Sequence, residues 1–221
     1  MRRLSTALAA AAMVAACVPA QAESVVKLPA AAYDPAVKAT RATAVLAGGC
    51  FWGVEGVLER VKGVISVESG YHGGAKETAV YELTHDGTTG HAEAVRVVYD
   101  PSVVSYGTLL RVLFSVVADP TLKNRQGPDY GTQYRAAIVP MDATQRAVAT
   151  RYLAQIGKGG YFAKPIVVPV ESYKAFYRAE AYHQNFMKLN PNHGYIRRWD
   201  APKLAALKKL FPELVSAKPA A

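Results

Sequence analysis

The order of predicted elements places this chain in the α+β class, with a mixed sheet and helices packed on it. Apolar periodicity alternates between strand-like and helix-like spacing from Ala42 onward. The first six elements follow the order β-α-β-β-α-β, which is the split βαβ pattern of ferredoxin-like sheets. The 221 residues are 51% hydrophobic and 19% charged, as expected for one globular domain. We therefore expect a ferredoxin-like core with a C-terminal extension.

The first half of the core reads as a strand, a helix and two further strands. Residues 42–47 form a short apolar run that stops at two glycines, which is typical of a buried strand. Apolar residues then recur at helical spacing from Val54 to Val61, and Gly63 marks the end of this helix. The β-branched runs at 64–71 and 92–99 predict two strands joined by a long glycine-rich connection.

The second half adds a helix, a strand, and a further helix, strand and helix. Residues 105–118 predict a helix with Ser105 as its N-cap. The run at 134–141 predicts a strand, and Asp142 is placed to cap a helix that extends to about Ile156. The run at 166–171 predicts a strand, and a last helix is expected over 175–189, before Asn190-Pro191.

The chain divides into a signal at 1–22, a linker at 23–40, one domain at 41–200 and a tail at 201–221, which carries at best a short amphipathic helix. The signal has a basic start, an apolar stretch and an A-x-A cleavage site at Ala20 to Ala22. It is shorter than the roughly 20 residues of a membrane-spanning helix. We expect its removal to give a soluble periplasmic or secreted protein.

A second interpretation of the signal concerns the sequence VAAC, Val14 to Cys17. It resembles a bacterial lipobox, in which case the signal ends at residue 16 and a lipidated Cys17 anchors the protein to a membrane. We favour cleavage after Ala22, because Pro19 followed by A-x-A is a well-formed soluble-export signal. The membrane-anchored lipoprotein is the alternative.

The net charge of +9 arises from 26 basic and 17 acidic residues. The basic clusters are short and are not interleaved with stacking aromatics, which favours a solvated surface over nucleic-acid binding. One internal cysteine and scattered histidines supply no metal-ligand cluster. We therefore expect neither a metal nor nucleic acid.

The sequence has two cysteines, Cys17 in the signal and Cys50 in the body. An exported chain with one remaining thiol has either a reactive group or a buried inert one. The strand-glycine-helix pattern places Cys50 at the first turn of a helix. There, unpaired backbone N–H groups and the helix dipole lower a thiol pKa from about 8.5. This placement predicts a nucleophilic thiolate.

Two aromatic residues follow the thiol directly. Phe51 and Trp52 are adjacent on the expected helix and cannot both face its apolar stripe. One of them is expected to line a small apolar cleft beside Cys50. The alternative is that both are core aromatics at the start of a helix.

Three further groups have a chemical and a plain structural interpretation. Glu93, in the sequence GHAE, starts a strand that the split βαβ layout places beside the first strand. In a partly apolar site its carboxyl would have a raised pKa and act as a general acid; otherwise it is a surface glutamate. Tyr134 and Asp129, in DYGTQYR, and also Tyr81 offer hydrogen-bonding groups, although tyrosines in such positions are often simply packed.

Five segments together resemble one known family, the A class of peptide methionine sulfoxide reductases. The resemblance extends from about Ala42 to Tyr195, in order and with matching spacing. The segments are GGCFWG at 48–53, GYHGG at 70–74, GHAEAVRVVYDP at 90–101, RQGPDYGTQYR at 125–135 and AYHQNFMKLNP at 181–191.

The resemblance implies a catalytic role for four residues. Cys50 would attack the sulfoxide sulfur, and Glu93 would protonate the sulfoxide oxygen. Tyr81 and Tyr134 would donate hydrogen bonds to the same oxygen. The product would be methionine, with Cys50 left as a sulfenic acid.

The resemblance also implies how substrate is bound. Phe51 and Trp52 would hold the S-methyl group, and Asp129 would support the polar side of the pocket. His91, in the same motif as the acid, is given only a local structural role. The substrates would be S-sulfoxides of methionine in proteins, in peptides or as the free amino acid. The activity would repair oxidative damage to exported proteins.

The chain departs from many members of this family in its C-terminal region. Residues 192–221 contain no cysteine that could resolve the sulfenic acid, so the chain resembles a one-cysteine form. Its reductant would be an external thiol, from a thioredoxin-like or glutaredoxin-like protein or a small molecule. No organic cofactor is implied, and we expect a monomer. Ala118 stands where many relatives have histidine, which leaves the contacts around that position open.

Two rival functions remain from the residues alone. A cysteine hydrolase or acyl transferase would use Cys50 with His91 or His183 as its base. A non-catalytic module would bind methionine-rich partners through a pocket at Phe51 and Trp52.

Overall fold

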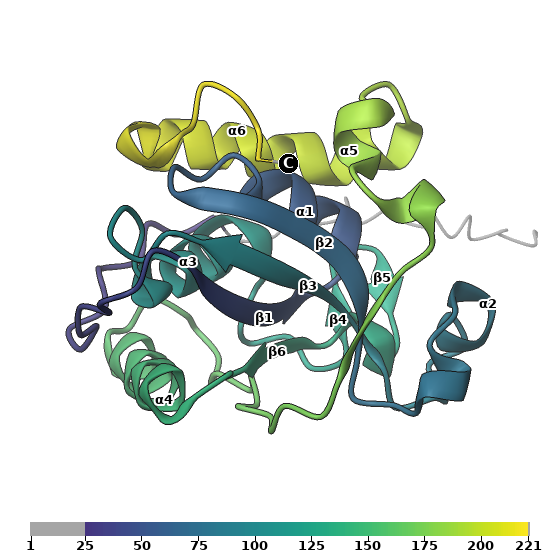
Figure 1. Cartoon of the computed structure of the whole chain (residues 1–221), viewed down its shortest axis with the longest axis horizontal. Helices are drawn as coiled ribbons and strands as arrows, with labels where there is room; N and C mark the ends of the chain where they lie inside the picture. Colours follow the sequence, from purple (N-terminus) through teal and green to yellow (C-terminus); the bar gives the residue numbers. More distant parts are fainter. Residues whose placement is uncertain (1–24, 221) are drawn as a thin grey trace, which may run out of the picture.

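The computed structural model describes residues 25–220 and contains a five-stranded sheet at its centre (Figure 1). The strand order is β6-β1-β3-β2-β7, and all neighbouring strands in it are antiparallel. The strands are β1 (Ala42–Gly48), β2 (Val64–His72), β3 (Ala92–Tyr99), β6 (Ala136–Val139) and β7 (Phe176–Arg178). The two export signals predicted over 1–22 lie outside the described residues.

Six α-helices lie within residues 25–220, and those of the predicted core are α1, between β1 and β2, and α3, between β3 and β6. In chain order the core is β1, α1, β2, β3, α3 and β6, so the predicted β-α-β-β-α-β pattern and the α+β class are confirmed. The helices are α1 (Phe51–Leu58), α2 (Tyr81–Thr84), α3 (Tyr106–Val112), α4 (Ala143–Lys158), α5 (Phe186–Leu189) and α6 (Ala201–Leu210). None of the helices described here is long and apolar enough to cross a membrane.

Strand β1 shows how the sheet separates two apolar layers. Ala44 and Leu46 contribute to the main core, which includes the buried faces of α1 and α3. Val45 and Ala47 point to the opposite face and join a smaller apolar cluster. Successive side chains of a strand alternate between faces, so a continuous apolar run indicates burial on both sides.

The two predicted helix caps are present. The Ser105 hydroxyl accepts a hydrogen bond from the backbone N–H of Thr108 at 3.2 Å. The Asp142 carboxylate accepts one from the N–H of Gln145 at 2.7 Å. The helix predicted over 105–118 is not uniform, because α3 ends at Val112 and a wider π-helical turn continues to Val117.

The strand predicted over 166–171 is wrong. This segment contributes only an isolated parallel bridge between Val170 and Ile138. Pro169 has no backbone N–H, so a regular ladder cannot run through it. The Pro169 carbonyl accepts a hydrogen bond from Ile138, and Glu171 donates to the Ile138 carbonyl, both over short distances (3.1 and 2.9 Å).

The helix predicted over 175–189 is also wrong. The segment begins with β7, continues through a 3-10 turn at Ala181–His183, and becomes helical only in α5. Asn185 has a φ of 55°, in the left-handed region, which breaks a right-handed helix. This segment instead contacts the sheet and α1: the Gln184 side chain exchanges hydrogen bonds with the Ser69 backbone of β2, and His183 accepts one from Trp52 of α1.

Residues 25–40, predicted as a linker, contain no helix or strand but lie against the core. Leu28 is fully buried, and its carbonyl accepts a hydrogen bond from Arg111 at 2.7 Å. The Tyr152 hydroxyl donates to the Pro29 carbonyl at 3.0 Å. The expectation that the fold begins only after this segment is therefore corrected, since α3 and α4 need it to cover their apolar surface.

The C-terminal region packs on the side of α1 away from the sheet (Figure 1). The short helix predicted in the tail is present as α6. After it, Ser216 donates a backbone hydrogen bond to Arg60 at 2.7 Å, and Ala220 donates one to Glu59 at 2.8 Å. These bonds fasten the tail to the chain just beyond the C-terminal end of α1.

The buried Glu55 of α1 predicts a pH-dependent stability. Burial, and then the charge of Glu59, raises the pKa of Glu55 to about 8. Because the folded-state pKa lies above the ordinary one, the folded protein holds an extra proton between about pH 4.5 and pH 8. Glu55 should therefore lower the free energy of unfolding across this window as pH rises, and its own contribution is up to about 1.4 kcal/mol per pH unit.

Urea unfolding of Glu55→Gln at several pH values measures this effect. The variant should lose part of the decline, because a neutral amide does not titrate. Glu77→Gln, at an exposed position, is the matched control and should retain the wild-type slope. An unchanged slope in Glu55→Gln would contradict the assignment.

Candidate active site

Cys50 lies at the junction of β1 and α1, where the sequence placed it. It is the N-cap residue of α1 and is 8% exposed. Gly49 before it has a φ of 89°, and a Cβ there would lie 2.6 Å from Cβ of Gln126. Glycine is therefore required at this turn for both its backbone conformation and its lack of a side chain.

Glu93 approaches the start of α1 from the neighbouring strand. It lies on β3, which pairs with β1, and its direct partner on β2 is Tyr71. Its carboxylate oxygen Oε2 accepts a hydrogen bond from the Phe51 backbone N–H at 2.9 Å. The Phe51 N–H has no partner within the helix, so the Glu93 carboxyl serves as its hydrogen-bond acceptor, one residue from Cys50.

The expected lowering of the Cys50 pKa is wrong. Burial raises this pKa well above its ordinary value, and the nearby carboxylates Glu93, Asp200 and Asp129 raise it further. A hydrogen bond from the Trp52 backbone acts in the opposite direction but is weaker. The thiol is therefore protonated at neutral pH in the free protein, although it stands at a helix N-terminus.

The expected rise in the Glu93 pKa agrees with its surroundings. The residue is 3% exposed, and burial raises the pKa of its carboxyl to about 8 despite the hydrogen bond from Phe51. Negative charge on Asp129 and Asp200 acts in the same direction. At pH 7 the site therefore holds a neutral carboxylic acid next to a thiol.

Tyr81 is the first residue of α2, Tyr134 is the last residue of a 3-10 turn, and both lie close enough to Glu93 and Cys50 to interact with their charges. Burial raises both hydroxyl pKa values, and the charges of Glu93 and Cys50 contribute to both. The two segments are joined by a hydrogen bond, which the Gln133 side chain donates to the His85 carbonyl at 2.6 Å. The structure thus brings the two phenols to the thiol and the carboxyl.

Phe51 and Trp52 diverge, as the helical spacing requires. Phe51 is 1% exposed, and its ring centroid lies 4.9 Å from that of His183. Trp52 is only partly buried and stacks on Phe186 of α5, with centroids 3.8 Å apart and planes at 10°. The Trp52 indole N–H donates to Nδ1 of His183 at 3.1 Å. Trp52 is therefore the aromatic at the edge of the site, and Phe51 belongs to its wall.

Asp129 is connected to a residue that the sequence did not single out. Its Oδ2 accepts a short hydrogen bond from the hydroxyl of Tyr195. The Tyr195 ring packs edge-on against Trp52 with centroids 5.8 Å apart. Asp129 and Tyr195 are far apart in the chain, so only the folded structure reveals the pair.

Asp200 is a second group that the sequence did not single out. It is fully buried and forms an ion pair with Lys203 at 3.5 Å. A Cβ on Gly53 would lie only 2.2 Å from its Oδ1, so this carboxylate sits directly against the first turn of α1. In the sequence the same segment reads as a basic surface cluster, RRWD, which gives no sign of a buried acid.

Comparison with known proteins matches this arrangement to one family. The family model described as peptide methionine sulfoxide reductase matches residues 42–214. The chain belongs to this family. The MsrA 2 protein of Mesorhizobium japonicum is 55% identical over 177 residues, which cover 80% of this chain and 91% of that protein. MsrA of Natronomonas pharaonis is 45% identical over 80% of this chain and 99% of its own.

Two solved structures share the fold with this member of the reductase family. Reduced Mxr1 from Saccharomyces cerevisiae has a TM-score of 0.59 and 31% identity, covering 72% of this chain and 91% of its own. Methionine sulfoxide reductase A of Corynebacterium diphtheriae has a TM-score of 0.58 and 30% identity, covering 76% and 85%. The resemblance inferred from the five sequence segments is thereby confirmed.

His91 and His183 of this reductase-family chain are engaged in structural contacts. His91 Nδ1 accepts a hydrogen bond from Gly74 at 3.2 Å, and Nε2 lies 2.9 Å from the Ala75 carbonyl. His183 accepts a hydrogen bond from Trp52 through Nδ1. Neither arrangement provides the free base that the rival hydrolase mechanism requires. Between residues 25 and 220, no group of three or more histidine, cysteine or acidic side chains could hold a metal.

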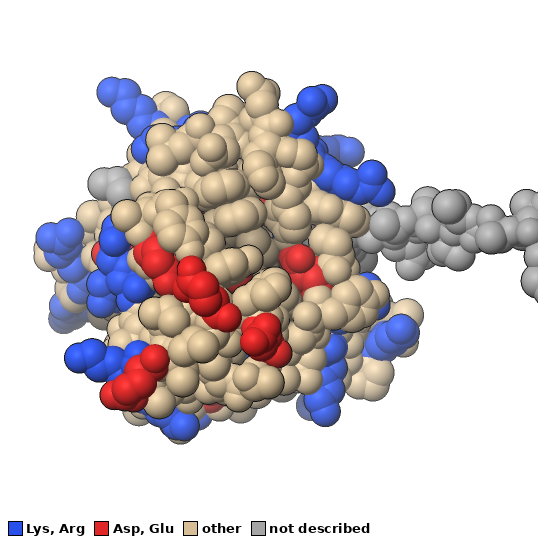
Figure 2. All heavy atoms as spheres, turned by 90° about the vertical axis from the view of Figure 1, so that its right-hand side faces the viewer, with Lys and Arg blue, Asp and Glu red and all other residues tan. Residues whose placement is uncertain are grey.

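The face of the reductase-family fold that carries α2 and α5 is locally acidic. Figure 2 shows this side, where acidic side chains gather toward the middle and most Lys and Arg side chains stand near the outline. The charged groups that raise the pKa of Cys50 are all carboxylates, namely Glu93, Asp200 and Asp129. The positive net charge of the chain is therefore not concentrated at the thiol.

Proposed function

We propose that this protein reduces the S-sulfoxide of methionine by oxidising Cys50 to a sulfenic acid, which an external thiol then reduces. The observation that carries this proposal is the buried pair at the start of α1. A thiol at the N-cap stands beside Glu93, whose carboxyl has a pKa of about 8 and is bonded to the adjacent N–H. Membership of the reductase family supports the same reaction.

The first step transfers the oxygen atom of the sulfoxide to the Cys50 sulfur. The Cys50 sulfur attacks the sulfoxide sulfur while Glu93 donates its proton to the sulfoxide oxygen. The thiol proton returns to the carboxylate, so Glu93 ends the step protonated. The attack forms a bond between the two sulfur atoms; this bond and the sulfur–oxygen bond of the substrate break as the protonated oxygen passes to the Cys50 sulfur, which leaves methionine and the sulfenic acid. Methionine sulfur is reduced by two electrons, and cysteine sulfur is oxidised by two.

The surrounding side chains orient the substrate for this step. The hydroxyls of Tyr81 and Tyr134 donate hydrogen bonds to the sulfoxide oxygen as it gains negative charge. Phe51 and Trp52 provide the apolar contacts for the S-methyl group. Asp129, held by Tyr195, sets the polar side of the pocket.

An external thiol completes the cycle in two steps. It condenses with the Cys50 sulfenic acid to give a mixed disulfide and water. A second thiol then attacks the mixed disulfide, which releases an oxidised donor and restores the Cys50 thiol. Cys50 is the free cysteine among residues 25–220, which supports a donor from outside this part of the chain.

A single-turnover measurement tests the reaction. Purified protein with Cys17→Ser, mixed with excess sulfoxide peptide and no reductant, should release one methionine per molecule and form one dimedone-reactive group at Cys50. Adding dithiothreitol should restore continuous turnover. The S epimer should be consumed and the R epimer spared. Absence of epimer-selective turnover would refute the proposal.

We also propose that the protein acts outside the cytoplasm, where it repairs oxidised methionines of exported proteins. The basic start, apolar stretch and A-x-A motif of residues 1–22 support export. Mass spectrometry of the mature N-terminus tests this. A chain beginning at Glu23 supports soluble export, a lipidated Cys17 supports the anchored form, and an intact Met1 in fractionated cells argues against both.

A further inference from the structure

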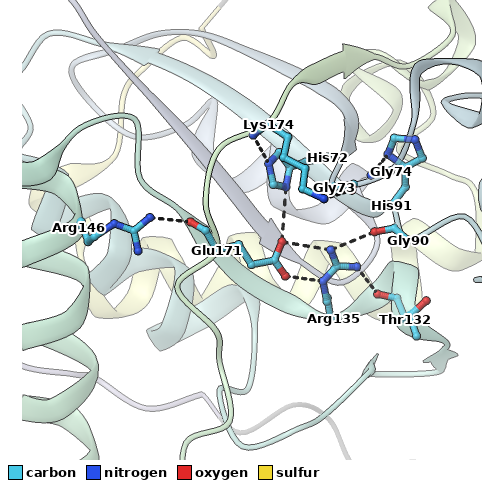
Figure 3. A network of polar contacts seen from close by, with 10 residues as sticks. All are labelled: His72, Gly73, Gly74, Gly90, His91, Thr132, Arg135, Arg146, Glu171 and Lys174. Atoms are coloured by element: carbon cyan, nitrogen blue, oxygen red, sulfur yellow. Dashed lines mark hydrogen bonds and ion pairs between the residues drawn. The ribbon is translucent and has the colours of Figure 1, made fainter.

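The guanidinium of Arg135 joins two segments that carry site residues (Figure 3). Its Nη1 donates to the Thr132 carbonyl at 2.9 Å, and its Nη2 donates to the Gly90 carbonyl at 3.3 Å. Its remaining donors meet the carboxylate of Glu171, with Nε 2.7 Å from Oε1 and Nη2 3.2 Å from Oε2. A planar group with several fixed donors is suited to such bridging.

Glu171 is itself held from several directions. Its backbone N–H donates to Ile138 at 2.9 Å, and its carbonyl accepts from Arg146 at 3.2 Å. His72 lies 3.5 Å from its carboxylate. Burial opposes ionisation, but the nearby His72 and the hydrogen bonds and charge of Arg135 lower the pKa of Glu171 to about 2. The carboxylate is therefore charged throughout the neutral range and fixes the guanidinium.

The two bridged carbonyls belong to the segments that lead into Tyr134 and Glu93. Thr132 begins the 3-10 turn that ends at Tyr134. Gly90, with a φ of 78°, comes three residues before Glu93. The Arg135 guanidinium thus links the segment that carries Tyr134 to the segment that carries Glu93.

We propose that Arg135 and Glu171 are positioning residues for sulfoxide reduction. By fastening the Thr132 turn to Gly90, the pair holds the Tyr134 hydroxyl and the Glu93 carboxyl at the separation that one sulfoxide oxygen requires. This inference rests on the proposed reaction. Wild-type turnover tests that reaction separately, so failure of one is distinguishable from failure of the other.

Arg135→Lys tests the pair with its charge retained. A single ammonium cannot contact two carbonyls and a carboxylate as a planar fork does. The single-turnover rate at saturating peptide should fall by about tenfold or more, because small displacements of catalytic groups have large effects on rate. The substrate concentration for half-saturation should change far less. Arg151→Lys, at an exposed position on α4 where the guanidinium lies over the Tyr33 ring, is the matched control and should keep the wild-type rate.

Chemical rescue separates positioning from general stability. Arg135→Ala should lose more rate than Arg135→Lys, and millimolar guanidinium should restore part of it, whereas equal potassium chloride should not. Glu171→Gln should reduce the rate, with a thermal unfolding temperature close to that of Arg151→Lys. If Arg135→Lys reacts as fast as Arg151→Lys, or if only the half-saturating peptide concentration changes and the rate at saturation does not, the inference is overturned.

Discussion

Replacing Cys50 by serine is expected to abolish sulfoxide reduction, with turnover falling by at least about 10⁴-fold, as for the loss of other catalytic nucleophiles. A serine hydroxyl cannot accept the oxygen in a two-electron exchange, whereas a cysteine sulfur can. Steady-state release of methionine with dithiothreitol as reductant measures the loss.

Two comparisons make the Cys50→Ser result specific. Cys17→Ser should keep wild-type turnover, since the proposed chemistry takes place at Cys50. Binding of a sulfoxide peptide, measured by calorimetry, should persist in Cys50→Ser because the apolar contacts of Phe51 and Trp52 remain. Persistent turnover in Cys50→Ser would exclude this thiol as the nucleophile. If the wild-type protein binds the peptide but shows no turnover, it is the non-catalytic binding module instead.

Replacing Glu93 by glutamine is expected to lower the single-turnover rate by about 10²–10⁴-fold, the usual contribution of a general acid. The amide fills the same space but does not transfer a proton. The wild-type rate should decline above pH 8, because rising pH deprotonates a carboxyl whose pKa is about 8. Rapid-quench measurements between pH 6 and pH 10 record both effects.

The pH profile of Glu93→Gln provides the control for this assignment. The variant should lack the alkaline decline that belongs to Glu93, while its unfolding temperature stays close to that of the wild type. Asp86→Gln, at an exposed site on the loop after α2, should retain both the rate and the decline. A decline of equal size and midpoint in Glu93→Gln would assign it to another group.

Local sequence patterns were sufficient for the elements that build the thiol site. The apolar run of β1, the glycines and the helical stripe of α1 together place Cys50 at an N-cap. The split βαβ order predicts that β3 lies next to β1, and the observed pairing brings Glu93 to the same point. These features follow from periodicity and chain order, which are visible in one sequence.

Contacts between distant segments could not be predicted from local sequence patterns. The pKa of Cys50 depends on burial and on Asp200, a carboxylate supplied by the C-terminal region. The Asp129–Tyr195 pair joins residues whose proximity no local pattern indicates. The helix expected over 175–189 fails for the same reason, because contacts of His183 and Asn185 with α1 outweigh local helix propensity.

The attachment of the tail limits how this protein can be re-engineered. Residues 216–220 are bonded to the chain beyond the C-terminal end of α1, whereas Cys50 caps the opposite end. An eight-residue helix is about 12 Å long, and a disulfide requires Cα atoms within about 7 Å. A cysteine grafted at Lys218 would therefore stay out of range until the tail detached. An internally recycled variant needs a new path for the chain as well as a second thiol.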